Sequence, residues 1–236
     1  MLRIIDARTG QPVPAAPARR SPTRVQAHAP GPGAAGLRVL LVADLLIRAL
    51  ELVGTPAWAL LSHAEDVDRL REEATALGIR PFEDAGASGP GVGRTVHVVH
   101  EGGAAPEGTT VAVAPADPAA PDLSDPDALR LALLERHHHA RVRLDPAALD
   151  EARATLARWR RAVAAWARQP SRPVPGEVRD RLRAAWEDDV DAPGVLRVLR
   201  RVETDPGLPD GARFETYAYA DRFLGLHLAR DVGAPE

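Results

Sequence analysis

The chain has 236 residues, of which 45% are hydrophobic and 27% are charged, an ordinary composition for a globular protein. Its formal net charge of -3 gives no electrostatic reason to expect nucleic acid or an acidic membrane surface as a partner. All 30 basic residues are Arg, so a P-loop lysine and a Schiff base are excluded, and the absence of Cys excludes disulfides and thiolate zinc sites.

The beginning of the chain predicts a short strand, a loop and a long apolar helix. Residues 2–7 resemble a strand and lack the apolar run of a signal peptide. Residues 11–36 are rich in Pro, Ala and Gly and predict a loop or linker. A helix is expected over 37–53, ending where Gly54 is followed by Pro56. Four charged residues within this helix argue against a membrane span, so we expect a cytoplasmic protein.

Alternation of strands and helices continues in the next segments. Residues 57–63 predict a buried strand and 64–78 a helix that ends in glycine. A flexible stretch over 83–93 precedes two further short strands, within 94–103 and 109–115. This order of elements predicts a parallel α/β layer in the first half of the chain.

The second half of the chain is almost entirely helical in its pattern. Helices are expected over 127–140, 147–168, 177–189, 193–203 and 212–230. We therefore predict two domains, over 1–120 and 121–236. The excess of Arg over acidic residues in the helical half is small, so a nucleic-acid surface is not expected there.

Three adjacent histidines, His137 to His139, form the most prominent cluster of candidate ligands. Side chains of adjacent helical residues point about 100° apart, so three of them on a helix would not converge on one metal ion. We interpret the run as a solvated helix end, with metal binding as the less favoured alternative. His97 and His100 lie three apart on an expected strand and therefore face opposite sides of it.

Other polar and aromatic features have structural explanations. The acidic stretch 187–191 precedes a helix that begins with Pro, so its carboxylates are expected as caps rather than as ligands of a divalent cation. Ser88 lacks the second glycine of a nucleophile elbow, and its surroundings predict a flexible loop. Trp159 and Trp166 lie seven apart on one helix face and are expected in the hydrophobic core.

Segments of the helical half resemble a known family. Residues 125–163 contain a "DP…LR..LL…H" helix followed by a helix with "ARW", and 184–202 contain "AAWEDDVDAPGVLRVLRRV". Together with "DRFLGLHL" at 221–228, they resemble cysteinyl-tRNA synthetases and, more closely, the mycothiol-pathway ligases that join cysteine to glucosaminyl-inositol. The resemblance implies a reduced Rossmann-like parallel layer of the class I synthetase (HUP) type, followed by a helical bundle like the anticodon-binding domain.

The first half resembles the same family with its nucleotide motif replaced. Residues 2–14 resemble the opening strand of the family, and 42–68 resemble the block that follows its HIGH signature. If Asp44 is set on the aspartate of that block, the signature falls on the turn from Gly33 to Gly36. In the family, the two signature histidines stabilise the triphosphate during adenylation, and glycine supplies no charge in their place.

The other chemical motifs of the family are also replaced. Residues 102–114 fit over the KMSKS segment, so Gly102 to Pro106 stand where the family has a lysine-bearing loop that closes over ATP. The cysteines that bind zinc in the family have no counterpart, although His28 lies near the position of the first. The chain is also shorter than these enzymes, and the missing length falls within 80–95. We therefore expect no cysteine adenylation.

Three functional hypotheses follow. The first is a non-catalytic relative that acts as a binding or scaffold protein, paired with a full-length paralogous ligase or with itself. The second is residual binding of ATP or an aminoacyl-adenylate in the crevice at the carboxyl ends of the strands. Its candidate residues are Gly33, Gly36, Arg38, His63, Asp66 and Asp68. The third is an unrelated enzyme built on His97, His100 and Glu101. No zinc is expected, and ATP is the one cofactor considered.

Overall fold

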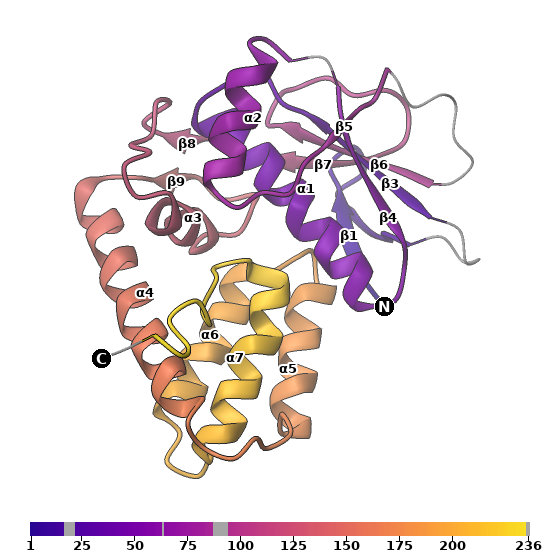
Figure 1. Cartoon of the computed structure of the whole chain (residues 1–236). Coiled ribbons are helices and arrows are strands. Elements are labelled where there is room, and N and C mark those ends of the chain that lie inside the picture. Colours follow the sequence, from indigo (N-terminus) through magenta and orange to yellow (C-terminus); the bar gives the residue numbers. More distant parts are fainter. Residues whose placement is uncertain (17–21, 63, 87–93, 235–236) are drawn as a thin grey trace.

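The computed structural model describes residues 1–16, 22–62, 64–86 and 94–234, and it confirms the predicted fold class (Figure 1). A parallel sheet has the strand order β5-β4-β3-β6-β7. Its strands are β3 (Thr23–His28), β4 (Ala57–Leu61), β5 (Glu83–Asp84), β6 (Arg94–His100) and β7 (Thr109–Val113). Two small sheets pair β1 (Arg3–Asp6) with β2 (Gln11–Pro14) and β8 (Ala116–Asp117) with β9 (Val142–Arg143).

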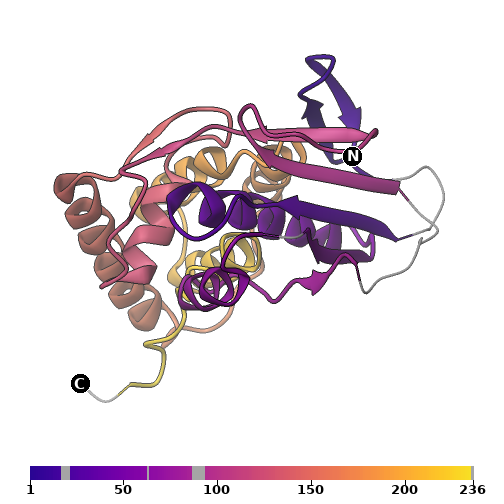
Figure 2. The same ribbon diagram turned by 90° about the horizontal axis from the view of Figure 1, so that it is seen from above.

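Helices cover the sheet and form the second half of the chain. They are α1 (Ala34–Leu52), α2 (Val67–Ala76), α3 (Pro126–Leu134), α4 (Pro146–Trp166), α5 (Gly176–Glu187), α6 (Ala192–Thr204) and α7 (Asp210–Leu224). Figure 2 shows the strands side by side toward one end of the molecule and α4 at the other. No helix among the described residues is long and apolar enough to cross a membrane.

The central strand, β3, corrects the prediction of a loop over residues 11–36. β3 pairs in parallel with β4 on one side and with β6 on the other. Val25 and Ala27 are fully buried, and Arg24 on the other face is nearly so. The six residues of β3 do alternate, with Val25 and Ala27 toward α1 and Arg24, Gln26 and His28 on the other face, but the Pro- and Gly-rich flanks concealed so short a strand. The strand expected at 2–7 does form, as β1, but in a hairpin outside the parallel sheet.

Helix α1 lies between the sheet and the helical half and is the most buried helix of the first half (Figure 1). It contacts β3, β4 and β6 on one side and α7 on another. The sheet face that it covers carries the apolar residues Val25, Ala27, Val96, Val98 and Val111. The helix ends as predicted, before Gly54, whose φ of +78° is a left-handed conformation open to glycine.

Three helices of the second half begin with an Asp cap and Pro in the first turn, and at α6 the cap comes from the acidic stretch 187–191, as predicted. Asp125, Asp145 and Asp191 accept hydrogen bonds from the backbone N–H groups three residues later, at the beginnings of α3, α4 and α6. Each of these helices has Pro in its first turn, where the missing N–H costs nothing.

The aromatic residues of α4 form a core with α7, as predicted. Trp159 and Trp166 are buried, and their rings lie 5.7 and 5.1 Å from the ring of Tyr217 in edge-on arrangements. The Tyr217 hydroxyl donates to the carbonyl of Leu199 at 3.0 Å. One hydrophobic cluster includes these residues and the core around α1, while the domain boundary near residue 120 stays a prediction.

Two predicted helices are shorter in the structure. The first ends at Leu134 instead of continuing through the histidines to residue 140. The last ends at Leu224, because Gly225 takes a left-handed conformation with φ of +62°. A Cβ atom at Gly225 would lie 2.7 Å from Nη2 of Arg130, so glycine favours this turn and leaves room for the guanidinium.

Candidate functional site

The glycine-rich turn before α1 has a steric reason for its glycines. A Cβ atom at Gly33, which has a φ of +99°, would lie 2.7 Å from the carbonyl oxygen of Ala119. A Cβ atom at Gly36 would lie 1.8 Å from the carbonyl oxygen of Gly31. Both contacts are far too short for any side chain, so close packing of backbone on backbone requires glycine at these two positions.

The N-terminus of α1 is capped by groups of the chain itself. The N–H of Gly33 donates to Oε2 of Glu73 at 3.0 Å, and the N–H of Ala34 donates to the carbonyl of Ala119 at 2.8 Å. Glu73 is buried, and its other oxygen accepts from Arg69 at 3.0 Å. The Glu73 carboxylate thus occupies the place at which a helix N-terminus would favour a phosphate.

A pocket of about 420 Å³ lies beside this helix end. The charged residues that line it are Glu65, Asp66, Arg69 and Glu73. Three carboxylates against one guanidinium leave the pocket negative, and like charges a few ångströms apart repel by roughly 1–4 kcal/mol in a partly solvated site. The pocket therefore disfavours a polyphosphate.

The structure brings together only some of the residues predicted for nucleotide binding. Gly33 and Asp66 line the pocket, and Gly36 lies in the first turn of α1 behind it. Asp68 is an exposed residue of α2 whose carboxylate lies 3.8 Å from Arg71. His63 lies outside the described residues.

Arg38, the remaining predicted residue, is buried and binds backbone carbonyls. Its Nη1 donates to Ala114 and Pro115, and its Nη2 donates to His137 and Ala140 at 2.9 and 2.7 Å. Burial lowers the pKa of Arg38 to about 10, so the guanidinium still carries its charge at neutral pH. Its terminal nitrogens hold the loop after α3 against the end of β7.

The segment that fits over the KMSKS loop connects β6 with β7. Gly102 has a φ of +79°, and the N–H of Gly103 donates to the carbonyl of His100 in a tight turn. Arg8 reaches across from the β1–β2 hairpin and donates from Nη2 to the carbonyls of Ala105 and Pro106. The loop is thus fastened to the hairpin by an arginine that precedes the sheet in sequence.

A network of polar side chains lies on the sheet face that α1 does not cover. Nε2 of His28 lies 2.9 Å from Nδ1 of His97, and Nδ1 of His28 lies 3.0 Å from the hydroxyl of Ser62. His100 lies three residues beyond His97 on β6, on the other face as predicted, and Glu101 is exposed. The structure therefore does not bring His97, His100 and Glu101 together.

Burial lowers the pKa of His97 to about 4, and the neighbouring charges of His28 and Arg8 act in the same direction. The unfolded chain takes up this proton near pH 6.5, whereas the folded chain takes it up only near pH 4. The contribution of neutral His97 to the free energy of unfolding is therefore fully present above pH 6.5 and is lost as the pH falls toward 4. We expect a loss of about 2 kcal/mol from His97 between pH 7.5 and 5.0.

Urea unfolding at the two pH values measures this loss. His97→Asn keeps a polar atom at the position of Nδ1 but does not titrate, so the drop in stability between pH 7.5 and 5.0 should shrink by about 2 kcal/mol. His227→Asn, which changes an exposed histidine, is the matched control and should keep the drop of the unaltered chain. Equal drops in all three proteins would contradict this account of His97.

The three adjacent histidines lie in a turn after α3, so their predicted helical placement is wrong. In this turn they converge on one carboxylate. Oδ2 of Asp189 lies 3.2 Å from Nε2 of His138, 3.9 Å from Nε2 of His137 and 3.8 Å from Nδ1 of His139. Burial and the charges of the other two histidines lower the pKa of His137 to about 4, so its ring is neutral at pH 7.

No family model matches the chain, but individual proteins do. The L-cysteine:1D-myo-inositol 2-amino-2-deoxy-alpha-D-glucopyranoside ligase of Acidothermus cellulolyticus is 42% identical over 110 residues, which are 44% of this chain and 25% of the ligase. The ligase of the same name from Parafrankia sp. is 49% identical over 76 residues, 32% of this chain and 16% of the ligase. That from Streptosporangium roseum is 38% identical over 113 residues, 44% of this chain and 26% of the ligase.

The matches span 16 to 26% of the length of these curated relatives. It supports the resemblance drawn from the motifs, and the Rossmann-like sheet followed by helices has the architecture that the resemblance implied. The chain is thus a relative of the L-cysteine:1D-myo-inositol 2-amino-2-deoxy-alpha-D-glucopyranoside ligases, and through them of the class I cysteinyl-tRNA synthetases.

Proposed function

We propose that this chain is a non-catalytic relative of the cysteine ligases and acts as a binding or scaffold protein. Its proposed partner is a full-length cysteine ligase of the same host, with self-association as the variant of the same idea. In this proposal, the chain keeps the architecture of the family, which provides surfaces for assembly, and lacks the groups that activate cysteine.

The observation that carries the proposal is the occupied N-terminus of α1. Glu73 accepts the hydrogen bond of the Gly33 N–H, and backbone packing excludes any side chain at Gly33 and Gly36. A residue with a cationic side chain therefore fits neither end of the turn that aligns with the HIGH signature. Adenylation needs positive charge or hydrogen-bond donors at the phosphates, and the one arginine of this pocket, Arg69, already donates to Glu73.

The interior of the molecule is well built, which favours a retained binding role. Asp44 is fully buried and bonded to three arginines from different segments, and Tyr217 packs against two tryptophans of α4. Buried charges destabilise a fold unless they are paired, so the pairing of Asp44 fits a chain that must fold to act.

Residual binding of ATP is disfavoured by the same site. The pocket beside α1 carries three carboxylates and one arginine, and Arg38 donates to carbonyls elsewhere. Calorimetry with ATP and with a non-hydrolysable cysteinyl-adenylate separates the two hypotheses. We expect no heat of binding at millimolar ligand, and saturable binding of either ligand would favour the nucleotide-binding hypothesis instead.

Co-purification tests the proposed partner. The chain is tagged in its native host and purified beside an unrelated tagged protein of similar size, and the bound proteins are identified by mass spectrometry. We expect the full-length cysteine ligase of the host in the sample and a complex of defined stoichiometry when both purified proteins are mixed and sedimented. No reproducible partner, together with a monomer in sedimentation, would contradict the proposal.

A further inference from the structure

Four side chains with metal-binding atoms gather where the sheet half meets the helical half. They are His137, His138, His139 and Asp189, and one ligand atom from each lies within 4.8 Å of the others. The histidines follow α3, whereas Asp189 lies in the short connection between α5 and α6. The cluster therefore joins two segments that are far apart in the sequence.

The backbone holds Asp189 with one oxygen free to face the histidines. Its N–H donates to the carbonyl of Arg3 at 2.9 Å, and its Oδ1 accepts from the N–H of Ile5 at 2.8 Å. Asp189 is 6% exposed, and its Oδ2 has no hydrogen bond of good geometry among the described residues. This buried oxygen is the atom on which the three histidines converge.

The ring of His138 places a second unpartnered atom against this oxygen. Its Nδ1 lies 3.3 Å from the carbonyl of Ala112, which accepts a hydrogen bond when the ring carries its hydrogen on Nδ1. In that tautomer Nε2 offers a lone pair to a cation, and it lies 3.2 Å from Oδ2 of Asp189, which also has no hydrogen bond of good geometry. A histidine that donates its other nitrogen to a backbone carbonyl is the usual arrangement of a metal ligand.

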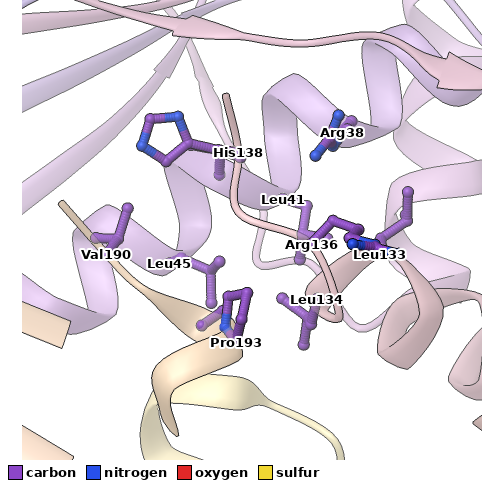
Figure 3. A pocket seen from close by; sticks show the side chains of 11 residues that line it. Arg38, Leu41, Leu45, Leu133, Leu134, Arg136, His138, Val190 and Pro193 are labelled. Atoms are coloured by element: carbon purple, nitrogen blue, oxygen red, sulfur yellow. The ribbon is translucent and has the colours of Figure 1, made fainter. Parts of the chain in front are cut away.

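The surroundings of the cluster are apolar on one side and open on the other. Figure 3 shows the side chains that line a small cavity next to His138 and Val190, among them Leu41, Leu45 and Pro193. Its volume of about 10 Å³ has room for about one water molecule. His139, by contrast, is 63% exposed, so an ion can reach the cluster from its side.

We propose that His137, His138, His139 and Asp189 bind one divalent transition-metal cation. Three nitrogens and one carboxylate oxygen match the number and kind of ligands in tetrahedral zinc sites. With metal–ligand distances of about 2.0–2.1 Å, ligand atoms in a tetrahedron lie about 3.3 Å apart. The separations of 3.2 to 3.9 Å from Oδ2 differ from this value by at most about 0.6 Å, and the ligand atoms, which lie within 4.8 Å of one another, must approach by up to about 1.5 Å.

The three imidazole nitrogens and one carboxylate oxygen indicate which class of cation the site prefers. Imidazole nitrogens suit Zn²⁺, Co²⁺ and Ni²⁺, whereas Mg²⁺ and Ca²⁺ prefer oxygen ligands. The site lies apart from the pocket at α1 and involves none of its residues. The ion would fasten the loop after α3 and the N-terminal strand to the α5–α6 connection, which is a structural role independent of the proposed function.

The test uses the full chain without an affinity tag, freed of metal by a chelator. We expect one equivalent of Zn²⁺ per chain in calorimetry and a rise of several degrees in the unfolding temperature. Co²⁺ should give the intense visible bands of a tetrahedral complex, and Mg²⁺ should give neither effect.

Two variants separate this site from unspecific binding to a run of histidines. Asp189→Asn keeps Oδ1 as acceptor for Ile5 and turns an amide N–H toward His138, so the metal-free fold should persist while Zn²⁺ affinity falls at least about tenfold. His139→Ala removes an exposed ring and should lower the affinity similarly. His227→Ala, an exposed histidine elsewhere, is the matched control and should bind like the unaltered chain.

The outcomes are decisive in either direction. One equivalent of Zn²⁺ that depends on both Asp189 and His139 supports the site. No binding to the unaltered chain would overturn it, as would equal binding to Asp189→Asn, because histidines alone would then hold the ion. If Asp189→Asn does not fold, His139→Ala decides, and unchanged affinity in that variant overturns the proposal. None of these results bears on the partner proposed above, since no residue is shared.

Discussion

Replacing Asp44 by Ala should destabilise the protein by about 3–5 kcal/mol, the largest effect that we expect from a single substitution. Asp44 is fully buried in the middle of α1. Its Oδ2 accepts from Arg48 at 2.8 Å and from Arg130 at 3.1 Å, and its Oδ1 accepts from Arg80 at 2.9 Å. Without the carboxylate, the buried Arg130 loses its ion pair and faces a cavity, whereas Arg80 keeps its pair with Glu51.

Arg130 makes this loss severe because it cannot reach solvent. It is 1% exposed, and its other nitrogens donate to the carbonyls of Leu77 and Leu224, at the ends of α2 and α7. Burial opposes the charge of Asp44, but the charges of Arg130 and Arg48 and the hydrogen bonds of the arginines overcome it and lower the pKa of this carboxyl. The network thus ties α1 of the sheet half to α3 and α7 of the helical half.

Urea unfolding at pH 7.5 measures the effect, with two further variants. Asp68→Ala removes an exposed carboxylate and should change stability by less than about 0.5 kcal/mol. Asp44→Leu combined with Arg130→Leu should recover much of the loss, because both buried charges leave together. A loss below about 1 kcal/mol for Asp44→Ala would show that the network does not hold the two halves together.

Replacing Arg38 by Met should cost about 3 kcal/mol, because a charged donor group is removed from four carbonyl oxygens. Two of these, the carbonyls of Pro115 and His137, also accept from backbone N–H groups, so the loss falls mainly on Ala114 and Ala140. The Met side chain keeps the apolar contacts of the arginine stem, so the difference in stability measures the contribution of the guanidinium group.

The same unfolding measurement applies, with Arg38→Lys and Arg161→Met as comparisons. Lys keeps the charge but not the planar fork, so Arg38→Lys should fall between the unaltered chain and Arg38→Met. Arg161 is exposed on α4, and its replacement should be nearly neutral. A neutral Arg38→Met would contradict the assignment of Arg38 to the loop after α3. Because that loop carries His137 to His139, Arg38→Met should also weaken Zn²⁺ binding.

Much of the fold could be predicted from the sequence where the pattern is local. Helix α4, for example, is predicted by an Asp cap followed by Pro and by an apolar face that carries Trp159 and Trp166. The strands β4, β6 and β7 are short apolar runs bounded by turns, and all three form as expected. These signals depend on neighbours within a few residues, which a sequence displays directly.

The histidine cluster could not be predicted because its causes are tertiary, whereas the central strand was concealed by its neighbours in sequence. β3 alternates over only six residues, between segments rich in Pro and Gly that predict a loop, and its pairing with strands on both sides shows only in the structure. The histidines converge because α3 stops at Leu134 and because Asp189 and Val190 take left-handed conformations, with φ of +54° and +51°. Such a conformation is rare for a β-branched residue, so no sequence rule places Asp189 opposite the histidines.

The occupied N-terminus of α1 could be predicted from the sequence only in part. Motif comparison indicated that the signature histidines are replaced at Gly33 and Gly36, but it gave no hint of what stands in their place. Glu73 belongs to the exposed-looking sequence of α2, and only the packing of α2 against α1 buries its carboxylate beside Gly33. The replacement of a binding group by an internal partner is visible only once both helices are placed.

Cysteine-dependent exchange of pyrophosphate into ATP tests whether this chain activates cysteine. The reaction reports formation of cysteinyl-adenylate, and it is run with the purified chain, cysteine and ATP, with and without added Zn²⁺. The ligase of Acidothermus cellulolyticus serves as the comparison under the same conditions. We predict exchange for that ligase and none above the protein-free blank for this chain. Exchange that requires cysteine, scales with the concentration of the chain and persists through repeated purification would contradict the account.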